Sequence, residues 1–327
     1  MVTTLTRRHF GKLAAASALA CPAVVQAQPA WPTKPVRILI SFPPGGSSDY
    51  VARVIAPALS EHFGQQFVVD NRPGAGGTVA GDILKREQPD GYTFLLSNNA
   101  PFTIAPTMFK KIPYNVVKDF THVCYLGATY GGLVAHANVG VKTVAELIAK
   151  AKAAPGQLSF GSSGVGSIGH ITGNTFCRAA GIDILHVPYR GAGPLRIDLT
   201  AGIIGLQFEG IVTSVPQIAA GEFFGLGVTS DKRLPAVPNI PTFKELGYDV
   251  SVKNWHGMSA PANLPPAITE KLSAALADIC QRQAITDQFA KIGNYYDPMT
   301  TAEFQAFVAD QIEVWRPMII AAGAGGQ

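Results

Sequence analysis

The sequence predicts an α/β fold with two domains, each a mostly parallel sheet flanked by helices. Three observations support this prediction. The 327 residues suit two domains, since one domain usually takes ~100–200 residues. Short apolar, β-branched runs alternate with amphipathic segments, which is the order of βαβ units. This alternation also restarts in the middle of the chain, as expected where a second domain begins.

The first half opens with a buried strand. Val36–Phe42 is largely apolar and β-branched, and the Pro-Gly loop Pro43–Ser48 follows it. The amphipathic segment Asp49–Phe63 ends at Gly64, a residue that commonly terminates helices. The other elements expected here are a strand at 67–70, a helix that ends near 86 and a strand at 93–97.

Capping boxes mark two helix starts in the rest of the chain. Thr143 and Glu146 have the spacing of such a box, as do Thr300 and Glu303. After Trp255 the pattern changes to long helices. The expected strands are 158–160, 184–188, 203–208 and 224–229, and the expected helices are 143–153, 169–180, about 195–201, 265–282, 284–292 and 301–322.

The first 27 residues have the pattern of an export signal. A basic segment with Arg7 and Arg8 precedes an apolar stretch, which ends in small residues before a cut expected after Ala27. The arginine pair favours twin-arginine export over an ordinary Sec signal, and either route predicts a periplasmic protein. A lipoprotein cleavage site at Cys21 is a further alternative.

Charge argues against a nucleic-acid-binding protein, and hydropathy excludes a multi-span membrane protein. The net charge is +4, but residues 1–27 hold three bases and no acid, which leaves 23 bases against 22 acids. No basic field remains to attract nucleic acid, so no nucleic-acid partner is expected. The longest apolar run, Leu13–Val25, is shorter than the ~20 residues of a membrane-spanning helix.

Cysteines and histidines give no sign of a metal or a cofactor. Cys124, Cys177 and Cys280 remain after signal removal, and their wide spacing fits no metal-ligand pattern. One disulfide is possible in an oxidising compartment, although buried free thiols are favoured. The seven histidines are scattered. We therefore expect neither a metal nor a cofactor.

Two strand–loop–helix junctions, Phe42–Asp49 and Gly161–His170, carry the functional signal. Each is expected to present free backbone amides and hydroxyls at a helix start, where the helix dipole favours an anion. The alternative is that both are plain tight turns. Asp49 is expected to cap its helix or pair with Arg53 rather than meet a ligand.

Enzyme motifs are absent or incomplete. Gly164, Gly166 and Gly169 spell the dinucleotide fingerprint G-x-G-x-x-G, but no acidic residue stands ~20 positions further on. No serine has the G-x-S-x-G context and no H-E-x-x-H occurs. These motifs therefore predict neither dinucleotide binding nor hydrolase chemistry.

Several polar residues at strand and helix ends have two interpretations each. His170 either donates to a ligand or packs and caps its helix, and Arg190 either clamps a carboxylate or is a solvated loop residue. Asn98 and Asn99 end a strand where open α/β sheets bind ligands. Glu209 accepts from a ligand hydroxyl or amine, or caps the next turn.

A family resemblance rests on the motifs of these loops and several others. Taken together, the motifs resemble those of the tripartite tricarboxylate transporter substrate-binding family, the Bug receptors, over essentially the whole chain after the signal. The matching segments are Phe42–Asp49 with Ala52-Arg53, Val69–Gly77, Pro89–Tyr92, Ser162–Ser167 with His170, His186–Gly191, Pro241-Thr242, Glu245–Gly247 and Trp255–Gly257. Glu209 departs from the family, which often has Asp there.

The resemblance implies a periplasmic solute-binding protein of flytrap architecture. Its domains would be 28–128 plus 253–327 and 129–252, joined by crossing strands with hinges near 126–134 and 252–256. Such a monomeric receptor captures a small carboxylate and delivers it to membrane permease subunits. An exported enzyme acting on a small organic acid and a receptor for a signalling partner are the alternatives. The candidate ligand-binding residues are Phe42, Pro44, Gly45, Gly46, Ser47, Ser48, Asn98, Asn99, Ser162, Ser163, Gly166, Ser167, His170, Tyr189, Arg190 and Glu209.

Overall fold

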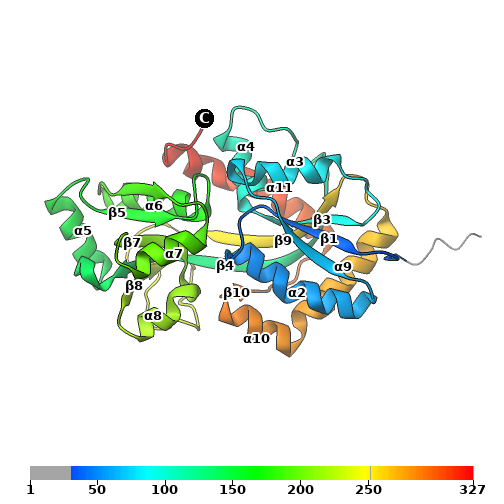
Figure 1. Ribbon diagram of the computed structural model, residues 1–327. Helices are drawn as coiled ribbons and strands as arrows, with labels where there is room; N and C mark the ends of the chain where they lie inside the picture. Colours follow the sequence, from blue (N-terminus) through cyan, green and yellow to red (C-terminus); the bar gives the residue numbers. More distant parts are fainter. Residues whose placement is uncertain (1–30, 251, 327) are drawn as a thin grey trace, which may run out of the picture.

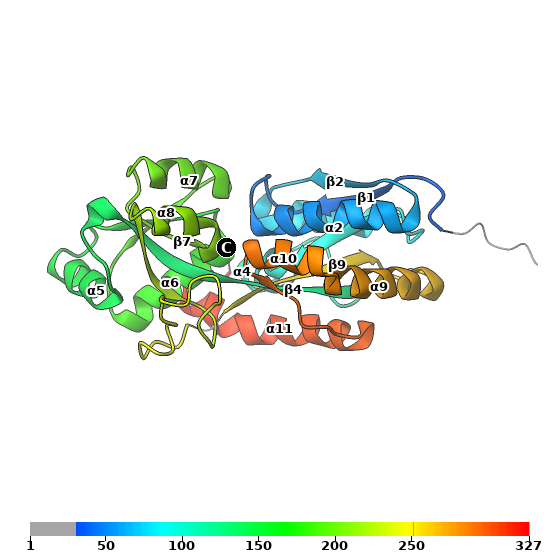
Figure 2. The same ribbon diagram turned by 90° about the horizontal axis from the view of Figure 1, so that it is seen from below.

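Two long strands run through the centre of the computed structural model, which describes residues 31–250 and 252–326. They are β4 (Phe120–His136) and β9 (Lys253–Pro261), paired antiparallel, and they connect two lobes of helices and strands (Figures 1 and 2). The interpretation of residues 1–27 as an export signal lies outside the described residues. Among those described, no helix is long and apolar enough to cross a membrane.

The first lobe is built on the parallel strands expected from the sequence. The strand order is β2-β1-β3-β9-β4, with β1 parallel to both of its neighbours and β9 antiparallel to β3 and β4. The strands are β1 (Val36–Ile40), β2 (Phe67–Asn71), β3 (Thr93–Asn98) and β10 (Asn294–Tyr295), the last paired with β4. The helices are α2 (Ser47–Phe63), η2 (Ala75–Gly77), α3 (Thr78–Arg86), η3 (Ala100–Ile104), α4 (Ala105–Met108), α9 (Pro266–Gln281), α10 (Gln283–Lys291) and α11 (Thr301–Ala321).

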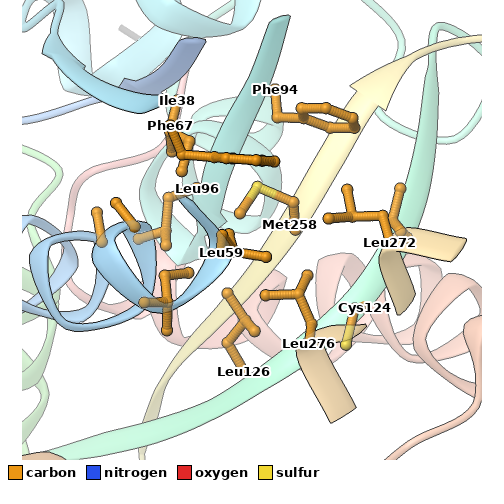
Figure 3. Packing of buried hydrophobic residues seen from close by; sticks show 14 of the residues in the cluster. Ile38, Leu59, Phe67, Phe94, Leu96, Cys124, Leu126, Met258, Leu272 and Leu276 are labelled. Carbon is orange, nitrogen blue, oxygen red and sulfur yellow. The ribbon is translucent and has the colours of Figure 1, made fainter. Parts of the chain in front are cut away.

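Both faces of this sheet are covered, because alternate side chains of its strands enter different cores. Ile38 and Leu96 face α2 and α9 in the core drawn in Figure 3. Leu39 and Leu95 face the opposite way, toward α3 and α11. The continuous apolar runs in the sequence reflect this two-sided burial.

The second lobe repeats the βαβ arrangement. β5 is parallel to both β6 and β7, whereas β7 and β8 pair antiparallel with the far half of β4. The strands are β5 (Ser159–Ser162), β6 (Leu185–Pro188), β7 (Leu206–Gly210) and β8 (Phe223–Val228). The helices are η4 (Ala137–Val139), α5 (Val144–Ala153), α6 (Ile168–Ala180), α7 (Ala192–Thr200), η5 (Ile211–Ser214) and α8 (Val215–Ala219).

The α/β fold class is confirmed, and so are most element types, with shifted ends. The expected strand at 203–208 starts only at Leu206, and the helix expected near 195–201 starts at Ala192. Thr300 and Glu303 form a complete capping box. Only half of the expected box at Thr143 forms. The Thr143 side chain accepts from the amide of Glu146, but the Glu146 carboxylate accepts from the amide of Lys142 rather than from that of Thr143.

The last helix contributes to both lobes. Phe304 and Val308, near the start of α11, pack in the first lobe, whereas Trp315 and Ile319 belong to the core of the second. Asn174 of α6 also donates to the carbonyl of Ala322 just after α11, at 3.2 Å. The part of the chain after 253 is therefore not confined to the first lobe (Figure 2).

The three described cysteines are free and buried. Cys124 and Cys280 lie in the first-lobe core, and Cys177 lies in the second. Burial raises the pKa of the Cys177 thiol to about 12. Burial also raises the pKa of Cys124 to about 12. The prediction of buried free thiols is confirmed for these three residues.

Candidate functional site

A cavity lies between the lobes, at the carboxyl ends of β1, β3 and β7. It has about 50 Å³ of room for the centre of a water-sized sphere, several times the ~10–15 Å³ that one water needs. Its only charged lining residue within the described chain is Glu209. The lining residues are Phe42, Pro43, Gly46, Ser47, Ser48, Asn98, Asn99, Ala100, Ser163, Ser167, Ile168, Gly191, Ala192, Glu209 and Asn254.

The start of α2 forms one wall of this cavity. Gly46 is the N-cap and provides no side chain to accept from the first amides of the helix. The hydroxyl of Ser48 accepts from Asn98 Nδ2 at 2.8 Å, so its own proton is available to donate. Unpaired amides, the helix dipole and these hydroxyls together make this wall attractive to an anion.

The loop before α2 is held by Asp49. Its carboxylate accepts from the amide of Gly45 at 3.0 Å, from Arg53 Nε at 3.0 Å and from Asn71 Nδ2 at 3.1 Å. Burial opposes ionisation, but these hydrogen bonds hold the pKa of Asp49 below its usual value. The interpretation of Asp49 as a structural residue is confirmed.

Asn99 supplies an unpaired donor. Its Oδ1 accepts from the backbone amide of Trp255 at 2.9 Å, which fixes the orientation of the side chain. Asn99 is only 1% exposed, and its Nδ2 is buried without a hydrogen-bond partner among the described residues. A buried amide without an acceptor costs ~1–3 kcal/mol, so this group is suited to a ligand oxygen.

The loop before α6 differs from the expectation. The amides of Ser163, Gly164 and Gly166 donate to Glu209, Ser162 and His170 respectively. Ser167 caps α6 by accepting from the amide of His170. The prediction that this junction presents free backbone amides is therefore wrong for Ser163, Gly164, Gly166 and His170, because the loop uses these donors internally.

Glu209 closes the opposite wall. One carboxylate oxygen accepts from the amide of Ser163 at 2.6 Å. Burial raises the pKa of Glu209, and the hydrogen bonds from Ser163 and the charge of Arg196 offset only part of that effect. The carboxylate also borders an adjoining pocket, which Arg196 and Gly45 line as well.

Two contributions to the cavity were missed from the sequence. Asn254 of β9 donates to Ser47 Oγ at 2.8 Å, and the start of α7 presents Gly191 and Ala192. α7 has no side-chain cap, so it adds a second uncapped helix start. Gly191 has a φ of +114°, which side chains other than glycine rarely adopt, and this backbone geometry cannot be read from sequence.

Ser162 and His170 lie behind the cavity wall. Ser162 Oγ lies 2.7 Å from His186 Nε2, and the rings of His170 and His186 stack with centroids 4.2 Å apart. Burial lowers the pKa of His170. Burial, then the neighbouring His170, lowers the pKa of His186 to about 4. These residues support the loop rather than line the cavity.

Tyr189 and Arg190 line a separate, outer pocket between the lobes. Phe42, Pro43 and Ser163 border both this pocket and the inner cavity. The Tyr189 hydroxyl donates to Asp198 Oδ2 at 2.9 Å. Of the remaining candidates, Pro44, Gly45 and Gly166 stand outside the lining of the inner cavity, although Gly45 lines the adjoining pocket.

Neutral hydrogen-bonding groups dominate the lining of the cavity. The described residues contain no group of three or more His, Cys, Asp or Glu placed to hold a metal ion. Serine hydroxyls, asparagine amides and helix starts surround the space instead. Such neutral donors can bind a small anion without a lysine or arginine.

The fold and this cavity define the chain as a periplasmic-type solute-binding protein. The structure of Rpa4515 from R. palustris with adipate matches with a TM-score of 0.87 and 32% identity, over 91% of this chain and 100% of that one. MatC (Rpa3494) from Rhodopseudomonas palustris with bound malate matches with a TM-score of 0.81 and 26% identity, over 88% and 100% of the two chains.

The family follows from the sequence comparisons. The chain belongs to the tripartite tricarboxylate transporter family receptors, whose family model matches residues 51–324. It is 33% identical to protein BugT of Bordetella pertussis over 296 residues, which cover 90% of this chain and 91% of that protein. The resemblance read from the loop motifs is confirmed.

Proposed function

We propose that this chain is a periplasmic receptor that captures a small carboxylate between its lobes and passes it to membrane permease subunits. It performs no catalysis of its own. The carboxylate contacts the start of α2 and the side chain of Asn99. The candidate residues of the second lobe close over the rest of the ligand.

The observation that carries this proposal is a cavity without cationic lining residues, bordered by the uncapped start of α2 and by Asn99, whose Nδ2 is buried without a partner among the described residues. An acceptor that fits there is small and carries an oxygen, and the helix start beside it favours a negative one. The adipate and malate in the two similar structures support a carboxylate.

The proposal also includes the domain division and a closing motion. The domains are 28–128 plus 253–327 and 129–252, with the end of α11 packed against the second domain, and β4 and β9 are the strands that connect them. Bending in these strands opens and closes the cleft. Export through the N-terminal signal, with a cut after Ala27, brings the monomeric protein to the periplasm.

Thermal unfolding of the purified protein with small carboxylates and their neutral amides tests this function. A ligand at 100 times its Kd stabilises the native state by ~2.7 kcal/mol. Since ~1 kcal/mol moves the midpoint by ~2–4 °C at this domain size, a shift of several degrees is expected with an acid and none with its amide. If no acid shifts the midpoint, and mass spectrometry of the denatured protein finds no retained acid, the proposal fails.

A further inference from the structure

The cavity has two walls of opposite polarity. We propose that its ligand is a carboxylate that also carries a hydrogen-bond donor, an ammonium or a hydroxyl group, and that Glu209 accepts from this donor. This inference rests on the proposed function and narrows its ligand class. It makes Glu209 a residue that determines specificity.

The donor wall consists of the start of α2 and Asn99. The helix has no side-chain cap, and Asn99 Nδ2 is buried without a partner among the described residues. Both features call for an acceptor with negative charge. The carboxylate of the ligand therefore belongs on this side.

The acceptor wall, opposite the donor wall, is formed by the carboxylate of Glu209. Glu209 accepts from the amide of Ser163 in the loop before α6, and its Oε1 lies close to Gly169 in the first turn of that helix. A Cβ at Gly169, the second residue of α6, would lie 3.0 Å from Glu209 Oε1 and 2.0 Å from the carbonyl oxygen of Phe208. The glycine therefore lets the carboxylate approach the helix closely.

Among the described residues, Glu209 has hydrogen bonds from Ser163 but no direct ion pair. Ser163 donates its amide at 2.6 Å and its side chain also hydrogen-bonds the carboxylate, whereas the guanidinium of Arg196 attracts Glu209 only at longer range and donates to the carbonyl oxygen of Thr213 at 2.6 Å. Because Glu209 borders the cavity, a ligand can supply the missing donor. A second carboxylate on this side would meet a like charge and be disfavoured.

A ligand that lacks the donor leaves this buried acid facing CH groups. Hydrogen bonds to charged groups are worth enough to change affinity by ~10- to 100-fold. Acids that differ only in this substituent should therefore differ strongly in affinity. The cavity is small, so the donor must stand within a few bonds of the bound carboxylate.

Calorimetric titration with matched sets of acids tests the inference. The sets are propionate, lactate and alanine; succinate, malate and aspartate; and adipate with 2-hydroxyadipate and 2-aminoadipate. In the set that binds, the hydroxy or amino acid should bind ~10- to 100-fold more tightly than the unsubstituted acid. Comparing these two substituted acids identifies which donor Glu209 accepts.

The variant Glu209→Gln removes the charge but keeps an oxygen that can accept from Ser163. It should abolish most of the preference, because the substituted acid loses its charged acceptor and the unsubstituted acid no longer faces an uncompensated carboxylate. Glu222→Gln, an exposed glutamate of the same lobe, is the matched control and should change neither affinity.

Three results would overturn the inference while leaving the receptor function intact. One is wild-type protein that binds the unsubstituted acid as tightly as its substituted partners. A second is a preference that survives Glu209→Gln. A third is tighter binding of the unsubstituted diacid, as expected if Glu209 is protonated and donates. Binding of no acid in any set would instead count against the proposed function itself.

Discussion

Asn254 donates to the hydroxyl of Ser47, the first residue of α2, across 2.8 Å. The same Nδ2 group donates to Oγ1 of Thr129 at 3.0 Å. Since Asn254 is in β9 and Thr129 is in β4, one amide connects both crossing strands to the wall of the cavity. The position of the anion-binding helix start therefore depends on the strands that join the lobes.

We predict that Asn254→Ala weakens carboxylate binding about tenfold and lowers the free energy of unfolding by ~1–3 kcal/mol. The variant removes two hydrogen bonds, one to Ser47 and one to Thr129, each worth ~0.5–1.5 kcal/mol of stability, but leaves the apolar cores intact. Titration calorimetry and urea unfolding measure the two effects. Lys253→Ala, at the exposed neighbouring position, is the control. Equal affinities for Asn254→Ala and wild type would show that this link does not position the site.

A second prediction concerns Asn99. Asn99→Asp keeps the oxygen that accepts from the amide of Trp255 but replaces the unpaired Nδ2 by a second oxygen. A ligand carboxylate then meets an acceptor where it needs a donor, so binding at neutral pH should fall by ~100-fold or more.

The matched control is Asn115→Asp, because Asn115 is exposed and uses only its Oδ1, which accepts from the amides of Val117 and Lys118. That variant should bind as the wild type does. A carboxylate that still binds Asn99→Asp with unchanged affinity would place the ligand elsewhere in the cleft.

The outer parts of both lobes were predictable because their signals are local. Val36–Ile40 is buried on both faces and therefore reads as a continuous apolar strand. The amphipathic run ending at Gly64 gave α2, whose last turn closes with that glycine at a φ of +65°. These elements depend on patterns within a few residues.

The crossing strands could not be delimited in the same way. β4 pairs with β9 in its first half and with β7 and β8 in its second, so its side chains serve two different sheets and show no single period. Gly127 lies where the register between β4 and β9 shifts. Its φ is +102°, and a Cβ at this position would come within 2.7 Å of the carbonyl oxygen of Tyr295.

The cavity itself was predicted in part for a related reason. The serines of the first loop and Asn98, Asn99 and Glu209 stand at helix or strand ends, which is a local property. Asn254 and the start of α7 reach the cavity only through the pairing of distant strands. The internal use of the second loop's amides depends on hydrogen-bond geometry, which spacing in the sequence does not reveal.

A third prediction concerns Gly169. Gly169→Ala places a methyl group 2.0 Å from the carbonyl oxygen of Phe208, which is backbone and cannot move freely. Overpacking of this kind costs ~1–3 kcal/mol, so the free energy of unfolding in urea should fall by about 2 kcal/mol.

Gly193→Ala provides a close control, since Gly193 is likewise the second residue of a helix, α7, but its added Cβ meets nothing within 4 Å. That variant should be as stable as the wild type or up to ~1 kcal/mol more stable, because alanine favours helix over glycine. Equal destabilisation of both variants would refute the steric explanation.

The last prediction concerns acid stability and the buried His122. Burial lowers the pKa of His122 to about 4, although the carbonyl of Val116 opposes part of this effect. The unfolded chain has the ordinary value near 6.5, so between about pH 6.5 and 4 it binds more protons than the native state does. Stability contributed by the neutral ring is thus complete above about pH 6.5 and is lost as the pH falls toward about 4.

The loss amounts to about 3 kcal/mol by pH 4, or about 1.4 kcal/mol per pH unit. Urea unfolding of His122→Gln from pH 4.5 to 6 should therefore show a shallower dependence on pH than the wild type, by about 1 kcal/mol per unit, whatever its absolute stability. The exposed His62 is the control, and His62→Gln should keep the wild-type slope. If the slope of His122→Gln equals that of the wild type, His122 ionises normally in the native state and acid sensitivity arises from other groups.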